Sequence, residues 1–70
     1  MSTLAETIAA ATTACTALMA GARVCIAARE YAVAVGLIEQ AQIKANESRN
    51  FAVADELFNM YVEMKVLAFG

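Results

Sequence analysis

The sequence predicts an all-α protein: a helical hairpin or a small three-helix bundle, with a long alanine-rich N-terminal helix, completed by oligomerisation. Two observations predict this class. Strong helix formers, alanine above all, dominate the 70 residues, and proline is absent. No two-residue hairpin turn separates alternating strand-like segments. We expect one domain over residues 1–70, with helices at about 3–28, 30–46 and 50–68, the first two being either separate or continuous.

The first predicted helix begins with a capping box. Thr3 and Glu6 have the spacing at which a hydroxyl accepts a hydrogen bond from the amide three residues on, while the carboxylate reaches back. An apolar stripe of mostly small residues follows at spacings of four and three, which is typical of a heptad pattern. Its members are Leu4, Ile8, Ala11, Cys15, Leu18, Ala22 and Cys25.

The second predicted helix follows a change of frame, because the first heptad pattern would next place Arg29 on the apolar side. The new frame comprises Ala28, Tyr31, Ala34, Ile38, Ala41 and Ala45. Such a slip predicts either a helix break near residues 29–30 or a continuous helix with local overwinding.

The last predicted helix spans residues 51–68 and follows five polar residues, 46–50, which are typical of a helix end. It carries two apolar stripes, which favour contact with two partners, one in the same chain and one elsewhere. The first stripe comprises Phe51, Ala54, Phe58 and Tyr61. The second comprises Val53, Leu57, Met60, Met64 and Leu67, and we expect this second stripe to face another chain.

An internal similarity links residues 29–38 with residues 49–58, because an arginine, an aromatic residue, Ala-Val-Ala and a leucine coincide at an offset of twenty. If the motif marks a helix start in both places, the architecture is three helices; otherwise it is a hairpin with one long arm. The spacing from Tyr31 to Ala41 resembles the second helix of a tetratricopeptide repeat. The offset departs from that family's period of about 34 residues, so we interpret the pattern as a convergent arrangement of residues for helix packing.

Candidate chemistry is sparse. Cys15 and Cys25 would lie about 15 Å apart along one helix, beyond the reach of an intrachain disulfide, and we interpret them as small buried hydrophobic residues. A disulfide between two chains stays open. With no histidine and no cysteine pair at metal-binding spacing, we expect no metal and no cofactor. No glycine-rich phosphate loop and no nucleophile with a neighbouring base are evident, so we predict no enzymatic activity.

Charge and hydropathy limit the partners. Five Lys and Arg against seven Asp and Glu form no basic stripe, so we expect no nucleic acid. Residues 7–22 are uncharged, but this run is shorter than the roughly 18 residues of a membrane span. The start of the chain lacks the positive charge of a signal peptide. We therefore expect no membrane insertion and a reducing, cytoplasmic location.

Assembly is the function that the pattern favours. If the last helix folds back on the second, residues 3–27 have no intrachain partner and expose a large apolar surface. We predict a small non-enzymatic protein that acts through protein–protein contact, with itself as a homo-oligomer or with another protein. By analogy of size and composition, it would be an accessory, adaptor or inhibitor of phage or bacterial type. The predicted interface residues are Leu4, Ile8, Ala11, Cys15, Leu18, Val53, Leu57, Met60, Met64 and Leu67.

Two alternatives belong to other classes of protein. One is a structural subunit of a filament or shell, whose alanine-rich arms interlock. The other is a small-ligand binder with its pocket at an oligomer interface, where Arg23, Arg29 and Arg49 would hold an anionic ligand.

Overall fold

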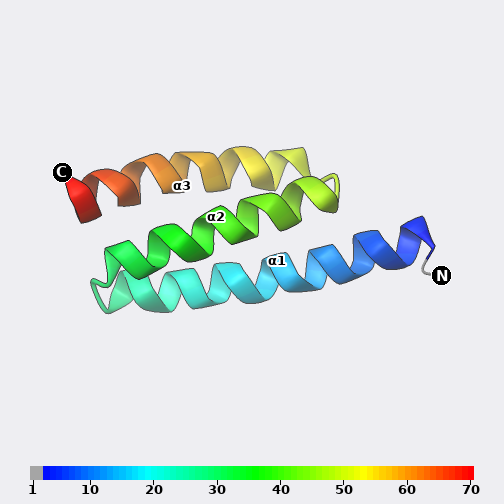
Figure 1. The fold of residues 1–70 in the computed structure, drawn as a ribbon, viewed down its shortest axis with the longest axis horizontal. Helices are drawn as coiled ribbons and strands as arrows, with labels where there is room; N and C mark the ends of the chain where they lie inside the picture. Colours follow the sequence, from blue (N-terminus) through cyan, green and yellow to red (C-terminus); the bar gives the residue numbers. More distant parts are fainter. Residues whose placement is uncertain (1–2) are drawn as a thin grey trace.

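The computed structural model describes residues 3–70 and is all-helical, as predicted. Its three helices are α1 (Leu4–Ala27), α2 (Tyr31–Glu47) and α3 (Phe51–Phe69). Successive helices run antiparallel, and α2 lies between the other two (Figure 1). Of the two architectures that the sequence allows, the structure has the three-helix one, with separate first and second helices.

The central helix, α2, packs against both of its neighbours, whereas in residues 3–70 no Cα atom of α1 lies within 8 Å of one in α3. The molecule is elongated, with extents of 43 × 19 × 15 Å. The expectation that residues 3–27 lack an intrachain partner is wrong. The helix α1 buries Ala11, Cys15 and Ala22, because α2 is apolar over an arc wide enough to contact two helices.

Small side chains make this double contact close. Ala34, Ala41 and Ala45 of α2 are fully buried, together with the larger Ile38. Helix axes approach most closely where the side chains at the contact are small. These four residues belong to the second frame predicted from the sequence, which therefore identifies the inner face of α2.

The turn between α1 and α2 is a Schellman motif. The Glu30 N–H donates to the Cys25 carbonyl at 2.8 Å, and the Arg29 N–H donates to the Ile26 carbonyl at 3.0 Å. These are the 6→1 and 5→2 bonds that satisfy the last carbonyls of a helix. Arg29 has a φ of 61°, the left-handed conformation that the motif requires.

The turn between α2 and α3 repeats this geometry twenty residues later. The Asn50 N–H donates to the Ala45 carbonyl at 2.9 Å, and the Arg49 N–H donates to the Asn46 carbonyl at 3.0 Å. Arg49 has a φ of 60°. The internal similarity in the sequence therefore corresponds to one turn used twice, with the arginine in the left-handed position and a new helix starting two residues later.

The helix starts differ in how they are capped. The Thr3 Oγ1 accepts from the Glu6 N–H at 3.1 Å, which is the hydroxyl half of the predicted capping box. At α3, the Asn50 Oδ1 accepts from the Val53 N–H at 3.3 Å. The residue preceding α2 is Glu30, whose side chain forms no cap bond.

The two left-handed arginines are strained positions, because an L-residue with a Cβ adopts this conformation only at a cost. We predict that Arg29→Gly or Arg49→Gly each raises the free energy of unfolding by about 0.5–1 kcal/mol. Urea denaturation at one fixed protein concentration measures this. Arg23→Gly, inside α1, is the matched control and lowers the free energy of unfolding by about 1 kcal/mol. A loss of stability at positions 29 and 49 as well would contradict the turn geometry.

Candidate interaction surface

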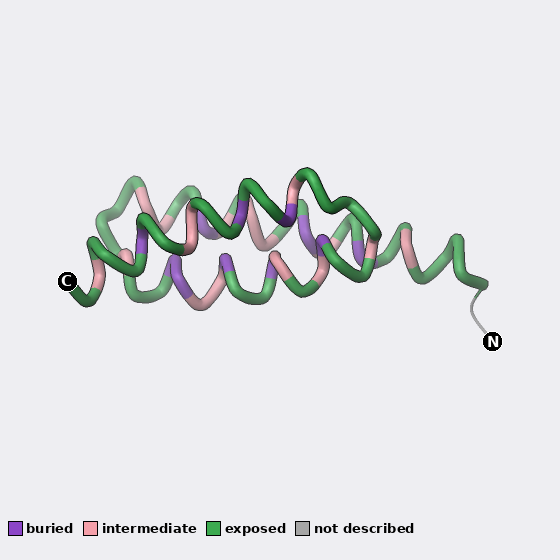
Figure 2. The backbone as a smooth tube through the Cα atoms, turned by 90° about the horizontal axis from the view of Figure 1, so that it is seen from above, coloured by how far each residue is buried: buried purple, intermediate pink, exposed green. Residues whose placement is uncertain are grey.

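Large apolar side chains are exposed on all three helices, most of them on α3 (Figure 2 shows the exposed residues along the outside of each helix). In the part of the chain that the structure describes, they are Leu4, Val24, Val33, Ile43, Phe51, Phe58, Val62, Val66, Leu67 and Phe69. Single exposed apolar residues are ordinary, but a contiguous row of them indicates an interaction surface.

Five of these residues form a row that we call the outer α3 stripe: Phe51, Phe58, Val62, Val66 and Phe69. At 100° per residue they fall on one side of α3. Each exposes between 46% and 66% of its surface. The opposite side of α3 buries Ala54, Leu57 and Met64 against the core.

The structure exchanges the two stripes of α3 in part. Of the predicted first stripe, Phe51 and Phe58 are exposed, whereas Ala54 is buried and Tyr61 packs partly buried against the core. Leu57 and Met64, predicted to face another chain, are buried in the chain's own core, and Val53 and Met60 pack partly buried against it. Of the predicted second stripe, only Leu67 is exposed.

The sequence did contain a signal for this arrangement. The outer α3 stripe continues through Asp55 and Lys65, whereas the stripe of Leu57 and Met64 includes no charged residue. Packing the outer α3 stripe against α2 would remove the charges of Asp55 and Lys65 from water, which is costly unless the two charges are paired. The uncharged stripe is therefore the one that enters the core.

The predicted interface residues of α1 also fall into two groups, buried and exposed. Ala11 and Cys15 are buried against α2, whereas Ile8 and Leu18 are half-buried and Leu4 is 63% exposed. The first two turns of α1 extend beyond the rest of the bundle (Figures 1 and 2). Only this end of the predicted α1 surface is free.

Four threonines of α1 direct their hydroxyl groups to their own helix. Each donates to the carbonyl oxygen four residues earlier, at distances between 2.9 and 3.1 Å; they are Thr7, Thr12, Thr13 and Thr16. Hydroxyl groups bonded in this way need no partner from solvent or from a neighbouring helix. Within residues 3–70, α1 is the one helix long and apolar enough to cross a membrane.

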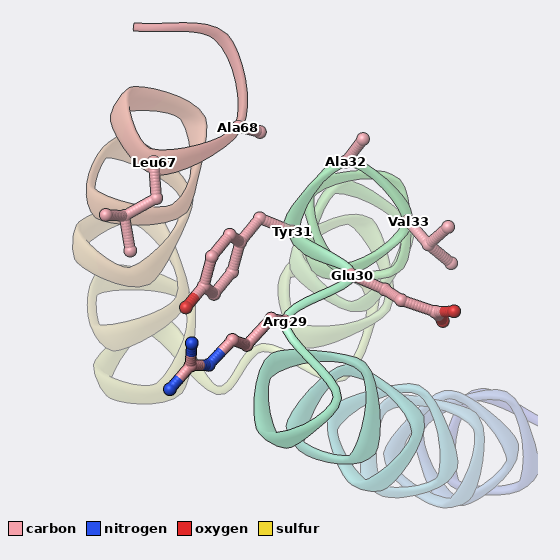
Figure 3. A pocket seen from close by; sticks show the side chains of 7 residues that line it. All are labelled: Arg29, Glu30, Tyr31, Ala32, Val33, Leu67 and Ala68. Atoms are coloured by element: carbon pink, nitrogen blue, oxygen red, sulfur yellow. The ribbon is translucent and has the colours of Figure 1, made fainter.

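A cleft of about 470 Å³ lies where the start of α2 approaches the end of α3 (Figure 3). Its lining residues are Arg29, Glu30, Tyr31, Ala32, Val33, Leu67 and Ala68. The Arg29 and Tyr31 side chains lie side by side toward α3, while the Glu30 carboxylate points away from them (Figure 3). The cleft therefore offers one cation, one aromatic ring and an apolar wall.

The three arginines of the anionic-ligand alternative do not converge. Arg29 lies in the turn before α2, and Arg49 lies in the turn after it. The intervening helix is about 25 Å long at 1.5 Å per residue. Arg23 is exposed on α1 and does not line the cleft. Within one copy of the chain, these side chains cannot hold one small anion together.

The two cysteines are free thiols in different environments. Cys15 is buried, with its Sγ 3.4 Å from the Ala41 carbonyl oxygen and 3.9 Å from the Met19 Sδ. Burial raises the pKa of the Cys15 thiol. Cys25 is only half-buried. The prediction that both cysteines are small buried residues therefore agrees fully with Cys15 and only in part with Cys25.

Charged side chains form few fixed contacts. Lys44 Nζ lies 3.1 Å from the Glu47 carboxylate on α2. On α3, Lys65 Nζ lies 3.1 Å from the Tyr61 hydroxyl oxygen and 5.3 Å from the centre of its ring. The hydrogen bond with Tyr61 raises the pKa of Lys65. Residues 3–70 contain no cluster of three or more His, Cys, Asp or Glu side chains that could hold a metal ion.

Comparison with protein-family models, with curated proteins and with solved structures finds no match for this chain. Over residues 3–70 the structure shows a three-helix all-α protein with apolar side chains exposed along α3.

The two thiols should react at different rates with a maleimide or an aromatic disulfide reagent at neutral pH. Cys25 is expected to be modified in the folded protein. Cys15 should react at least about tenfold more slowly, because it is buried and its raised pKa lowers the fraction of reactive thiolate. Mass spectrometry of Cys15→Ala and Cys25→Ala variants separates the two rates. Equal rates in folded protein would show that Cys15 is accessible.

Proposed function

We propose that this is a small non-enzymatic helical protein that acts through protein–protein contact, associating with itself as a homo-oligomer. The observation that carries the proposal is the outer α3 stripe, whose three phenylalanines are 54–66% exposed. A phenylalanine exposed to this extent leaves on the order of 100 Å² in water. Together with the two valines, the stripe amounts to roughly 400–500 Å² of apolar surface, as large as the largest patch on a typical monomer.

The exposed start of α1 supports assembly as well. Leu4 is 63% exposed on a segment that extends beyond the α2 and α3 helices. A chain with two self-associating surfaces forms an open stack rather than a closed ring when the two contacts do not return to the first copy. The structural subunit of a filament or shell is therefore the second candidate, favoured by this separate surface.

The proposal also covers the compartment in which the protein acts and the partners that it does not bind. The two free thiols suit a reducing, cytoplasmic compartment. We propose that α1 does not enter a membrane, because its Ala11, Cys15 and Ala22 side is packed on α2. The net charge of −2 argues against nucleic acid as the partner.

Light scattering after gel filtration tests the proposal directly. At micromolar concentration we expect a defined multiple of the 7.4 kDa chain mass. A mass of one chain at every concentration would contradict self-association. Elongation with rising concentration in negative-stain images would favour the filament subunit over the closed oligomer.

A further inference from the structure

Four residues of the outer α3 stripe belong to a row whose order of apolar and charged positions is the same from either end, with opposite charges at its two charged positions. Its spacings alternate between four and three, and its members are Phe51, Asp55, Phe58, Val62, Lys65 and Phe69. All six are exposed. This is the spacing of the a and d positions of a coiled coil, here on a helix side that has no partner within residues 3–70.

We propose that a second copy of this chain docks on α3, antiparallel to it, with the two-fold axis at the level of residue 60, between Phe58 and Val62. The inference rests on the proposed function and names its contact. In this register position 51 of one copy meets position 69 of the other, position 55 meets 65, and position 58 meets 62. Each layer is complementary: Phe51 meets Phe69, Asp55 meets the oppositely charged Lys65, and Phe58 meets Val62.

Charge complementarity fixes this register. Asp55 and Lys65 are the only charged residues on the row, and the two-fold axis pairs each with the other from the second copy. A parallel arrangement would place Asp55 against Asp55 and Lys65 against Lys65, which is repulsive. The Lys65 amine donates one hydrogen bond to Tyr61 and has two further N–H groups for a carboxylate.

The surface is also shaped for such a partner. A hollow of about 300 Å³ is lined by Val62, Lys65, Val66 and Phe69, together with Tyr61 and Gly70. Four residues at these spacings form the hole that receives one side chain of a facing helix in a coiled coil. In the proposed register that side chain is Asp55 of the partner subunit, which is thereby brought to Lys65.

The buried area is adequate for a dimer. An isologous contact uses the same surface twice, so two outer α3 stripes supply roughly 800–1,000 Å² of apolar surface. Polar residues along the edges of the row, such as Asn59, bring the total toward the approximately 1,200 Å² at which specific interfaces begin.

Charge reversal tests the register. We expect Asp55→Lys and Lys65→Asp each to weaken self-association by about tenfold or more, since each opposes like charges in two layers. An equimolar mixture of the two variants should recover the wild-type mass, because both layers then pair opposite charges again. The matched control is Glu56→Lys, which makes the same charge change one residue along and off the row, and it should leave the mass unchanged.

The outcomes separate this inference from the proposed function. A wild-type chain that is monomeric overturns both. A wild-type oligomer whose mass neither reversal alters, or whose variants fail to recover on mixing, overturns the α3 contact and leaves self-association through another surface or partner. Circular dichroism checks that each variant keeps its helices.

Cross-linking gives a second readout that does not depend on charge. With both native cysteines replaced by alanine, a mixture of Asp55→Cys and Lys65→Cys chains should form a mixed disulfide under mild oxidation. Asp55→Cys alone should not, because the two copies of position 55 lie about 15 Å apart along the axis. Equal cross-linking of Asp55→Cys with itself would overturn the antiparallel register.

Discussion

Close packing on two sides of α2 is the constraint on which the rest of the structure depends. A chain of 70 residues buries little core, and of the eleven buried hydrophobic residues in residues 3–70 six are alanine, beside larger ones such as Ile38 and Leu57. Because α1 and α3 do not approach each other, neither can be held by anything but α2. The alanine face of α2 therefore supports both contacts at once.

This arrangement determines what is left exposed. A helix in the middle of the layer uses most of its apolar surface, whereas α1 and α3 each bury one side and leave the other to solvent. On α1 the exposed side carries threonines whose hydroxyl groups donate to carbonyl oxygens of their own helix. On α3 it carries phenylalanines interrupted by Asp55 and Lys65, a mixture that suits an interface better than a core.

Sequence periodicity predicted most of the fold and less of the surface. The change of frame near Arg29 and the repeat at Arg49 marked both turns, since each helix buries residues at its own regular spacing. The prediction chose the wrong stripe of α3 to face α2. Apolar periodicity alone does not distinguish the two stripes; only the charges of Asp55 and Lys65 in one of them do. The left-handed arginines could not be foreseen either, since glycine and asparagine are the residues expected there.

Native-state hydrogen exchange, followed residue by residue, tests the central role of α2 most directly. Amides that open only with the whole molecule exchange slowest. The account predicts the slowest exchange in residues 34–45 of α2 and intermediate exchange in the packed parts of α1 and α3. Among amides bonded within a helix, it predicts the fastest exchange in residues 7–10 of α1. Slower exchange in α1 or α3 than in α2 would contradict the account, because a helix that packs only on α2 cannot stay folded after α2 has opened.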